Sequence, residues 1–114
     1  MRILVVGAGR TGARVLRQLQ KNDNLAVMTL DPVERPYAIE QGIIASVDIQ
    51  EALTPLTLDY VMAQAQPDLI LLTTGSEDLV LDQFPGTDIL AEALRDEFAA
   101  IAEVPVIEVS RAGL

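Results

Sequence analysis

A glycine-rich turn between an apolar run and an amphipathic segment constrains the fold of this chain more than any other feature. Residues 7–12 read GAGRTG, a G-x-G-x-x-G spacing, and they follow the β-branched run RILVV at residues 2–6. Such a run is typical of a strand buried on both faces of a parallel sheet. In residues 10–20, Ala13, Leu16 and Leu19 share one helical stripe, which predicts an amphipathic helix. The chain therefore opens with a strand, a glycine turn and a helix.

The same alternation of strand and helix patterns continues to the end of the chain. We expect further strands at residues 25–30, 43–47, 68–74 and 104–109, and further helices at residues 36–41, 57–66 and 87–102. Alternating strands and helices require right-handed crossovers between parallel strands. The sequence therefore predicts one domain over residues 1–114, with an α/β, Rossmann-like, doubly wound parallel sheet. Its five strands should lie in the order 3-2-1-4-5 with helices on both faces, and its ligand site should lie between the first and fourth strands.

Composition excludes several kinds of chemistry and of partner. The 114 residues include no cysteine and no histidine, which excludes zinc–thiolate sites, cysteine nucleophiles and Ser–His triads, and no metal site is expected. No apolar run approaches the length of a membrane span and no signal peptide is evident, so a cytoplasmic protein is expected. A net charge of −9 argues against nucleic acid as a partner. Residues 1–36 nevertheless carry six basic and three acidic side chains, so positive charge surrounds the first glycines.

The three glycines of the turn have separate roles in a dinucleotide-binding interpretation. Gly7 permits the tight turn, Gly9 leaves room for a pyrophosphate, and Gly12 lets the helix pack closely on the strand. The first N–H groups of the helix then face the phosphates. Asp31 ends the second predicted strand, 19 residues beyond Gly12, where a carboxylate accepts hydrogen bonds from ribose hydroxyls. The alternative is a glycine turn that only packs the helix, with Asp31 capping the segment that follows.

Asp31 also predicts which dinucleotide binds. A 2′-phosphate would meet the carboxylate charge, so we expect NAD(H) rather than NADP(H), with Arg35 as the one nearby group able to reverse this preference. A Walker loop is excluded because no G-K-[ST] follows the glycines, and a methyltransferase loop is a weaker alternative because no acid precedes Gly7.

Five further residues are candidates for cofactor contacts. Arg10 could close over the pyrophosphate and the Thr11 hydroxyl could donate to it, although Arg10 could equally be a solvated residue of the first helical turn. Thr73, Thr74 and Gly75 end the fourth predicted strand at the switch point, where small polar residues could touch the central part of a cofactor. The alternative is that they only satisfy the turn.

The segments RILVVGAGRTGARVLRQL, VMTLD and AIEQGI resemble the TrkA N-terminal domain, also called the RCK N-terminal domain (regulator of potassium conductance). The resemblance implies a regulatory domain that binds NAD(H), or ATP or another adenine nucleotide, pairs as a homodimer and acts on a potassium transporter in the membrane. It implies that residues 7 and 9–12 hold the phosphates and that Asp31 holds the ribose. It also implies that Asp48 reaches the adenine, although Val47 replaces the glycine that usually precedes this acid.

Two classes of function therefore remain open. The chain could be a non-catalytic nucleotide-binding module, or it could be the cofactor-binding domain or subunit of an NAD(P)-dependent dehydrogenase or reductase. The second class needs a proton donor, and without histidine or cysteine the only lysine, Lys21, lies in a polar turn. We therefore expect that the chain alone is not an oxidoreductase. We also expect self-association, because the fifth strand would form an open edge of the sheet.

Overall fold

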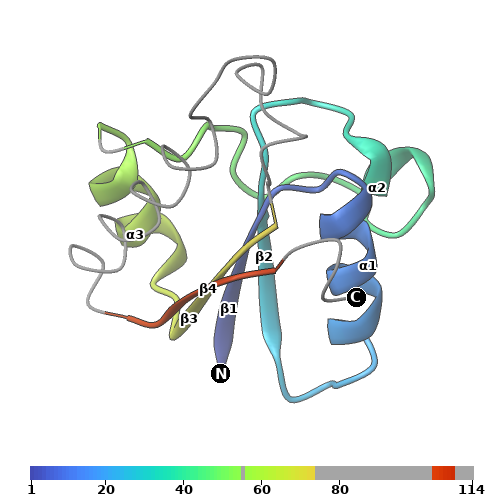
Figure 1. Cartoon of the computed structure of the whole chain (residues 1–114), viewed down its shortest axis with the longest axis horizontal. Coiled ribbons are helices and arrows are strands. Elements are labelled where there is room, and N and C mark those ends of the chain that lie inside the picture. The colour runs from blue at the N-terminus through green and yellow to red at the C-terminus, as the bar shows by residue number, and fades with distance from the viewer. Residues whose placement is uncertain (55, 74–103, 110–114) are drawn as a thin grey trace.

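The computed structural model describes residues 1–54, 56–73 and 104–109, and within them four parallel strands form one sheet. The strands lie in the order β2-β1-β3-β4 (Figure 1). Their bounds are β1 Arg2–Val6, β2 Ala26–Leu30, β3 Leu69–Leu72 and β4 Val106–Glu108. Since β1 and β3 are neighbours, the chain crosses from one side of β1 to the other after β2, as a doubly wound sheet requires.

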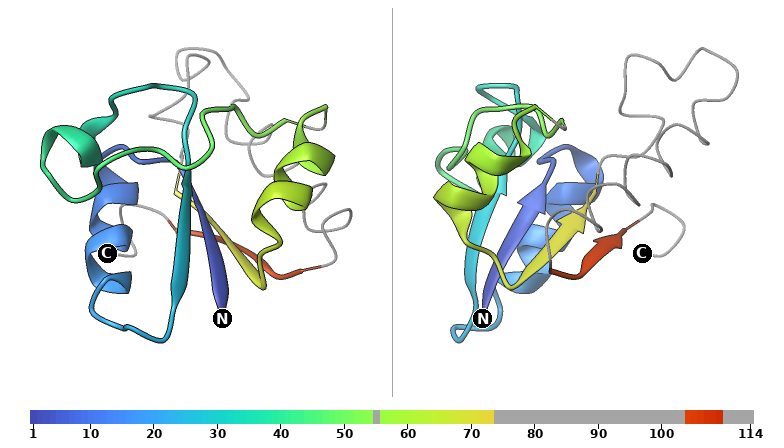
Figure 2. Two further views of the ribbon diagram at one scale, coloured as in Figure 1. Left: turned by 180° about the vertical axis from the view of Figure 1, so that it is seen from behind. Right: turned by 90° about the vertical axis from the view of Figure 1, so that its left-hand side faces the viewer.

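Helices cover both faces of this sheet, as the sequence predicts. Helix α1 spans Arg10–Leu19 and the short α2 spans Tyr37–Glu40, and both lie on one face. Helix α3, Leu58–Ala65, lies on the other face (Figures 1 and 2). The expected α/β, Rossmann-like architecture is confirmed, and the switch point lies between β1 and β3.

Alternating side chains of β1 explain why two helical layers are needed. Leu4 and Val6 belong to the core cluster that includes Val61 of α3. Ile3 and Val5 belong to the second cluster, with Leu16 of α1. A strand whose successive side chains point to opposite faces buries all of them only when both faces are covered.

The third predicted strand, at residues 43–47, is wrong. The backbone N–H groups of Ile43 and Ile44 donate to the carbonyl oxygen of Ala38 in α2, at 2.9 and 3.4 Å, and their side chains pack against the cluster around α1. Those groups are therefore not available to a ladder along β2. Where a third strand was predicted beside β2, the structure has a single parallel bridge, between Leu30 and Ile49. The predicted order is confirmed for the other four strands.

The remaining predicted elements differ from the observed ones mainly at their ends. Helix α3 is one residue shorter at each end than predicted, and Gln66 follows it in a left-handed conformation. Strand β4 lies beside β3, as expected of the fifth strand, but spans only three residues. The predicted helix at residues 87–102 lies outside the described residues. In the described part, no helix has the length and apolar character needed to cross a bilayer.

Candidate functional site

The glycine turn lies at the carboxyl end of β1 and leads directly into α1. Gly7 has a φ of 101°, a conformation that side chains rarely tolerate, and its N–H donates to the carbonyl oxygen of Leu30 at 2.7 Å. The turn is thereby attached to the end of β2. Gly9 is the N-cap of α1 and supplies no side-chain cap, while its carbonyl accepts the first helical hydrogen bond from Ala13. Among the residues that the structure describes, no side chain therefore caps the first N–H groups of α1.

Gly12 marks the closest approach of α1 to the sheet. A Cβ atom at this position would lie 2.0 Å from the carbonyl oxygen of Gly7 and 3.0 Å from the Thr73 hydroxyl. Both neighbours belong to the carboxyl ends of the central strands, so the absence of a side chain sets how near the helix N-terminus comes to the switch point.

Thr73 joins the two central strands at their carboxyl ends. Its N–H donates to the carbonyl oxygen of Val6 at 3.0 Å, and its hydroxyl lies 2.7 Å from the same oxygen and 3.1 Å from the carbonyl oxygen of Gly7. Only 3% of Thr73 is exposed. Its single hydroxyl proton is thus used within the protein, and contact of Thr73 with a cofactor stays a prediction. Thr74 and Gly75 lie outside the described residues.

Replacing Thr73 with valine should lower the free energy of unfolding by about 1 kcal/mol, because the hydroxyl that donates to the turn is lost while side-chain volume is kept. Thr73→Ser keeps the donor and is the matched control. Urea denaturation of the two variants measures the difference. Equal stability of the valine variant and the wild type would show that this hydrogen bond contributes nothing.

Asp31 lies directly after β2 and its carboxylate bridges back to the glycine turn. One oxygen accepts the buried N–H of Ala8 at 2.8 Å, and the other accepts the N–H of Val33 at 2.8 Å. Only 7% of the residue is exposed. A carboxylate offers about four acceptor positions, so two remain after these bonds. The fold therefore brings the turn and the distant acid together, as the dinucleotide interpretation requires.

Arg10 and Thr11, the two residues between the second and third glycines of the turn, differ in burial: Arg10 is exposed and Thr11 is buried. The guanidinium of Arg10 lies over the ring of Tyr37, 5.5 Å from its centroid, which attaches Arg10 to α2. Thr11 is buried in the first turn of α1, with 4% exposed. The proposed contacts of both residues with a pyrophosphate stay predictions.

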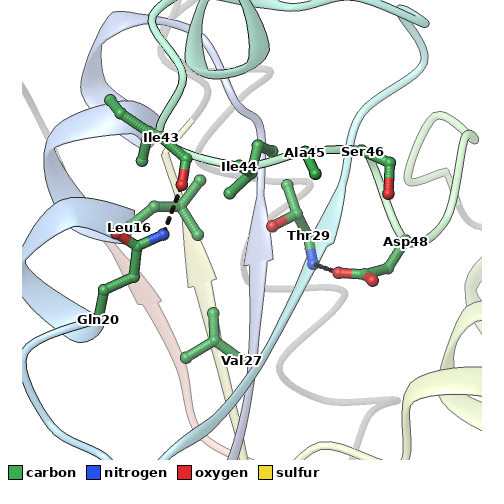
Figure 3. A pocket seen from close by; sticks show the side chains of 9 residues that line it. All are labelled: Leu16, Gln20, Val27, Thr29, Ile43, Ile44, Ala45, Ser46 and Asp48. Atoms are coloured by element: carbon green, nitrogen blue, oxygen red, sulfur yellow. Dashed lines mark hydrogen bonds between the residues drawn. The ribbon is translucent and has the colours of Figure 1, made fainter.

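Asp48 lies at the outer edge of β2. Its carboxylate accepts the N–H of Thr29 at 2.8 Å, and both residues line a cavity of about 380 Å³ beneath residues 43–46 (Figure 3). The carboxylate replaces one acceptor that a third strand would otherwise provide. The contact between Asp48 and an adenine, which the TrkA resemblance implies, stays a prediction.

A second cavity of about 280 Å³ lies between α1 and α2, and the sequence analysis did not identify it. It is lined by side chains of α1, by the first residue of α2 and by the segment that follows α2: Arg10, Ala13, Arg14, Arg17, Tyr37 and Ile43. The spacing of the three arginines at i, i+4 and i+7 is the signal that could have indicated it, since this spacing places them on one face of a helix.

Comparison with solved structures gives the same architecture. No family model and no curated protein matches the chain. The similar structures include UDP-glucuronic acid 4-epimerase from Bacillus cereus in complex with NAD, with 19% identity and a TM-score of 0.57 over 95% of this chain and 55% of that one. The same enzyme in complex with UDP-glucuronic acid and NAD matches with 17% identity, a TM-score of 0.56 and the same coverage. The chain thus spans about half the length of the structures that it resembles, and at this identity the likeness shows the fold.

Proposed function

We propose that the chain is an NAD(H)-binding domain. The observation that carries this proposal is the direct hydrogen bond between the glycine turn and the Asp31 carboxylate at the carboxyl ends of β1 and β2. A pyrophosphate would lie at the uncapped N-terminus of α1, and the adenosine ribose would use the free acceptor positions of Asp31. ATP and other adenine nucleotides share the adenosine half and would use the same two features.

The domain serves, in this proposal, as the cofactor-binding part of an NAD(P)-dependent enzyme. Two observations favour this role. The similar structures are those of an NAD-bound enzyme, and the chain spans only about half of that enzyme. A substrate-binding part would supply the proton donor in this role, because the chain has no histidine or cysteine and a single lysine, and its two tyrosines lie on α2 and α3.

A regulatory domain of the TrkA type is the second candidate, favoured by the G-x-G-R-x-G turn and by the short helix α2, which Gly42 follows. In this role the chain would pair as a homodimer and contact a potassium transporter. Competition between ATP and NADH separates the two candidates. Displacement of NADH by similar concentrations of ATP supports the regulatory domain, whereas a site that strongly prefers NADH supports the enzyme domain.

Replacing Gly9 with valine should abolish NADH binding, because the side chain would occupy the space of the pyrophosphate. Gly9 has a φ of −75° and a ψ of −156°, which L-residues adopt, so the fold should survive with a capping cost of about 1 kcal/mol. Calorimetric titration measures the affinity, and a thermal melt checks the fold. Gly9→Ala, with one added methyl group, should fall between the wild type and the valine variant. Equal NADH affinity in all three proteins would refute the binding mode.

A further inference from the structure

Three arginines converge on the cavity between α1 and α2. Arg10, Arg14 and Arg17 occupy successive positions on one face of α1, and the cavity that they line has a volume of about 280 Å³. Tyr37 stacks on Arg10, and Ile43 adds an apolar wall. The cavity is therefore built from a helix face that carries three positive charges and from a segment that holds one of them in place.

These charges have no counter-charge in the part of the chain that the structure describes. The one interaction shown for the three side chains is the contact between Arg10 and Tyr37, and none of them forms an ion pair there. The first turn of α1 also contains no acidic residue. Like charges three and four residues apart destabilise a helix, and a positive charge at its N-terminus opposes the helix dipole. All three arginines are exposed, and Arg17 in the last turn complements the dipole, so an anion in the cavity would relieve mainly the repulsion of Arg14 by its two neighbours.

The chemistry of the lining selects the kind of anion. Guanidinium groups match the oxygen pairs of phosphate with two parallel hydrogen bonds, which a single ammonium group does not provide. The volume lies at the lower limit of small-molecule pockets, about 300 Å³, so it fits a phosphate group with a small fragment and not a whole dinucleotide. Tyr37 also lines the cavity, and its hydroxyl is a neutral group able to donate a hydrogen bond.

The cavity begins beside the turn that would hold a pyrophosphate, at Arg10, and extends along α1 to Arg17. Helix α1 rises about 1.5 Å per residue, so Arg17 lies about 12 Å along the axis from Gly9. The far end of the cavity, at Arg17, therefore lies well beyond the first turn of α1, where a pyrophosphate would bind.

We propose that the cavity between α1 and α2 is a second anion site, at which Arg14 and Arg17 bind the phosphate group of a small molecule and Arg10 contributes from its rim. Two sources share this chemistry: the 2′-phosphate of NADP(H) bound at the glycine turn, and a separate phosphorylated metabolite. The first source depends on the proposed dinucleotide site, whereas the second does not.

The test is a titration of the isotope-labelled chain with inorganic phosphate, followed by NMR. The Nε–H signals of Arg14 and Arg17 report the cavity, and the backbone amide of Gly9 reports the glycine turn. The Arg14→Gln/Arg17→Gln double variant should lose about tenfold or more in phosphate affinity, equivalent to one charged hydrogen bond. The matched control is Arg2→Gln/Lys21→Gln, which removes the same net charge from exposed residues that do not line the cavity and should bind phosphate as the wild type does.

NADH and NADPH titrations of the same proteins identify the source. A loss of NADPH affinity alone in the Arg14→Gln/Arg17→Gln variant assigns the cavity to the 2′-phosphate. Phosphate binding that neither dinucleotide displaces assigns it to a separate ligand. Equal phosphate affinity in both double variants, or an unchanged pair of arginine signals, overturns the proposal. Failure of NADH to shift the Gly9 amide would instead refute the proposed function and leave the cavity result standing.

Discussion

Replacing Gly12 with alanine is expected to lower the free energy of unfolding by about 3 kcal/mol or more, since overpacking against rigid backbone is among the costly substitutions. The added Cβ would lie 2.0 Å from the carbonyl oxygen and 2.7 Å from the carbonyl carbon of Gly7. These atoms belong to the backbone of the turn, and the turn is attached to β2 through the Gly7 N–H. The Gly7 backbone and the added Cβ can therefore separate only if α1 moves away from the sheet.

Gly42→Ala is the matched control for this experiment. A Cβ at Gly42 would meet nothing within 4 Å, but the φ of 73° carries a conformational cost of about 1–2 kcal/mol. Urea denaturation of both variants therefore separates a steric clash from backbone strain. If Gly12→Ala were no less stable than Gly42→Ala, the close approach of α1 to the switch point would be wrong.

Replacing Asp31 with alanine should reduce both stability and NADH affinity. The buried N–H of Ala8 would lose its acceptor, at a cost of about 1–3 kcal/mol in the free energy of unfolding. The ribose would lose a charged hydrogen bond, so the dissociation constant for NADH should rise about tenfold or more. Asp31→Asn keeps one acceptor oxygen for two backbone donors and should lie between the alanine variant and the wild type.

Asp68→Ala is the control for the Asp31 variants. The Asp68 carboxylate also accepts one backbone N–H at 2.8 Å, from Arg2, but it is exposed and lies at the amino end of the strands. Water can replace an exposed acceptor, so this variant should stay close to the wild type in stability and in NADH affinity. Denaturation and calorimetry on the same preparations make the comparison. NADH affinity that survives Asp31→Ala would remove Asp31 from the site.

The sequence by itself predicted the elements whose signals are local. The run RILVV, the glycine turn and the stripe of α1 follow one another without interruption, and each pattern depends only on neighbouring residues. The order of four of the five predicted strands also followed, because parallel strands joined by right-handed crossovers leave few arrangements. Asp31 was placed correctly beside the turn because it directly follows β2, and the parallel pairing of β1 with β2 brings those two strand ends together.

Only the tertiary structure decided which partner each ambiguous group takes. Ile43 and Ile44 have the composition of a strand, but their N–H groups donate to α2, and the Asp48 carboxylate accepts the Thr29 N–H where a third strand would have paired. Arg10 lies over the ring of Tyr37, which is distant in sequence, and no local pattern predicts this contact. A local pattern predicts whether a segment is apolar or helical. The choice among competing hydrogen-bond acceptors and ring faces depends on distances that exist only after α1, α2 and β2 have packed together.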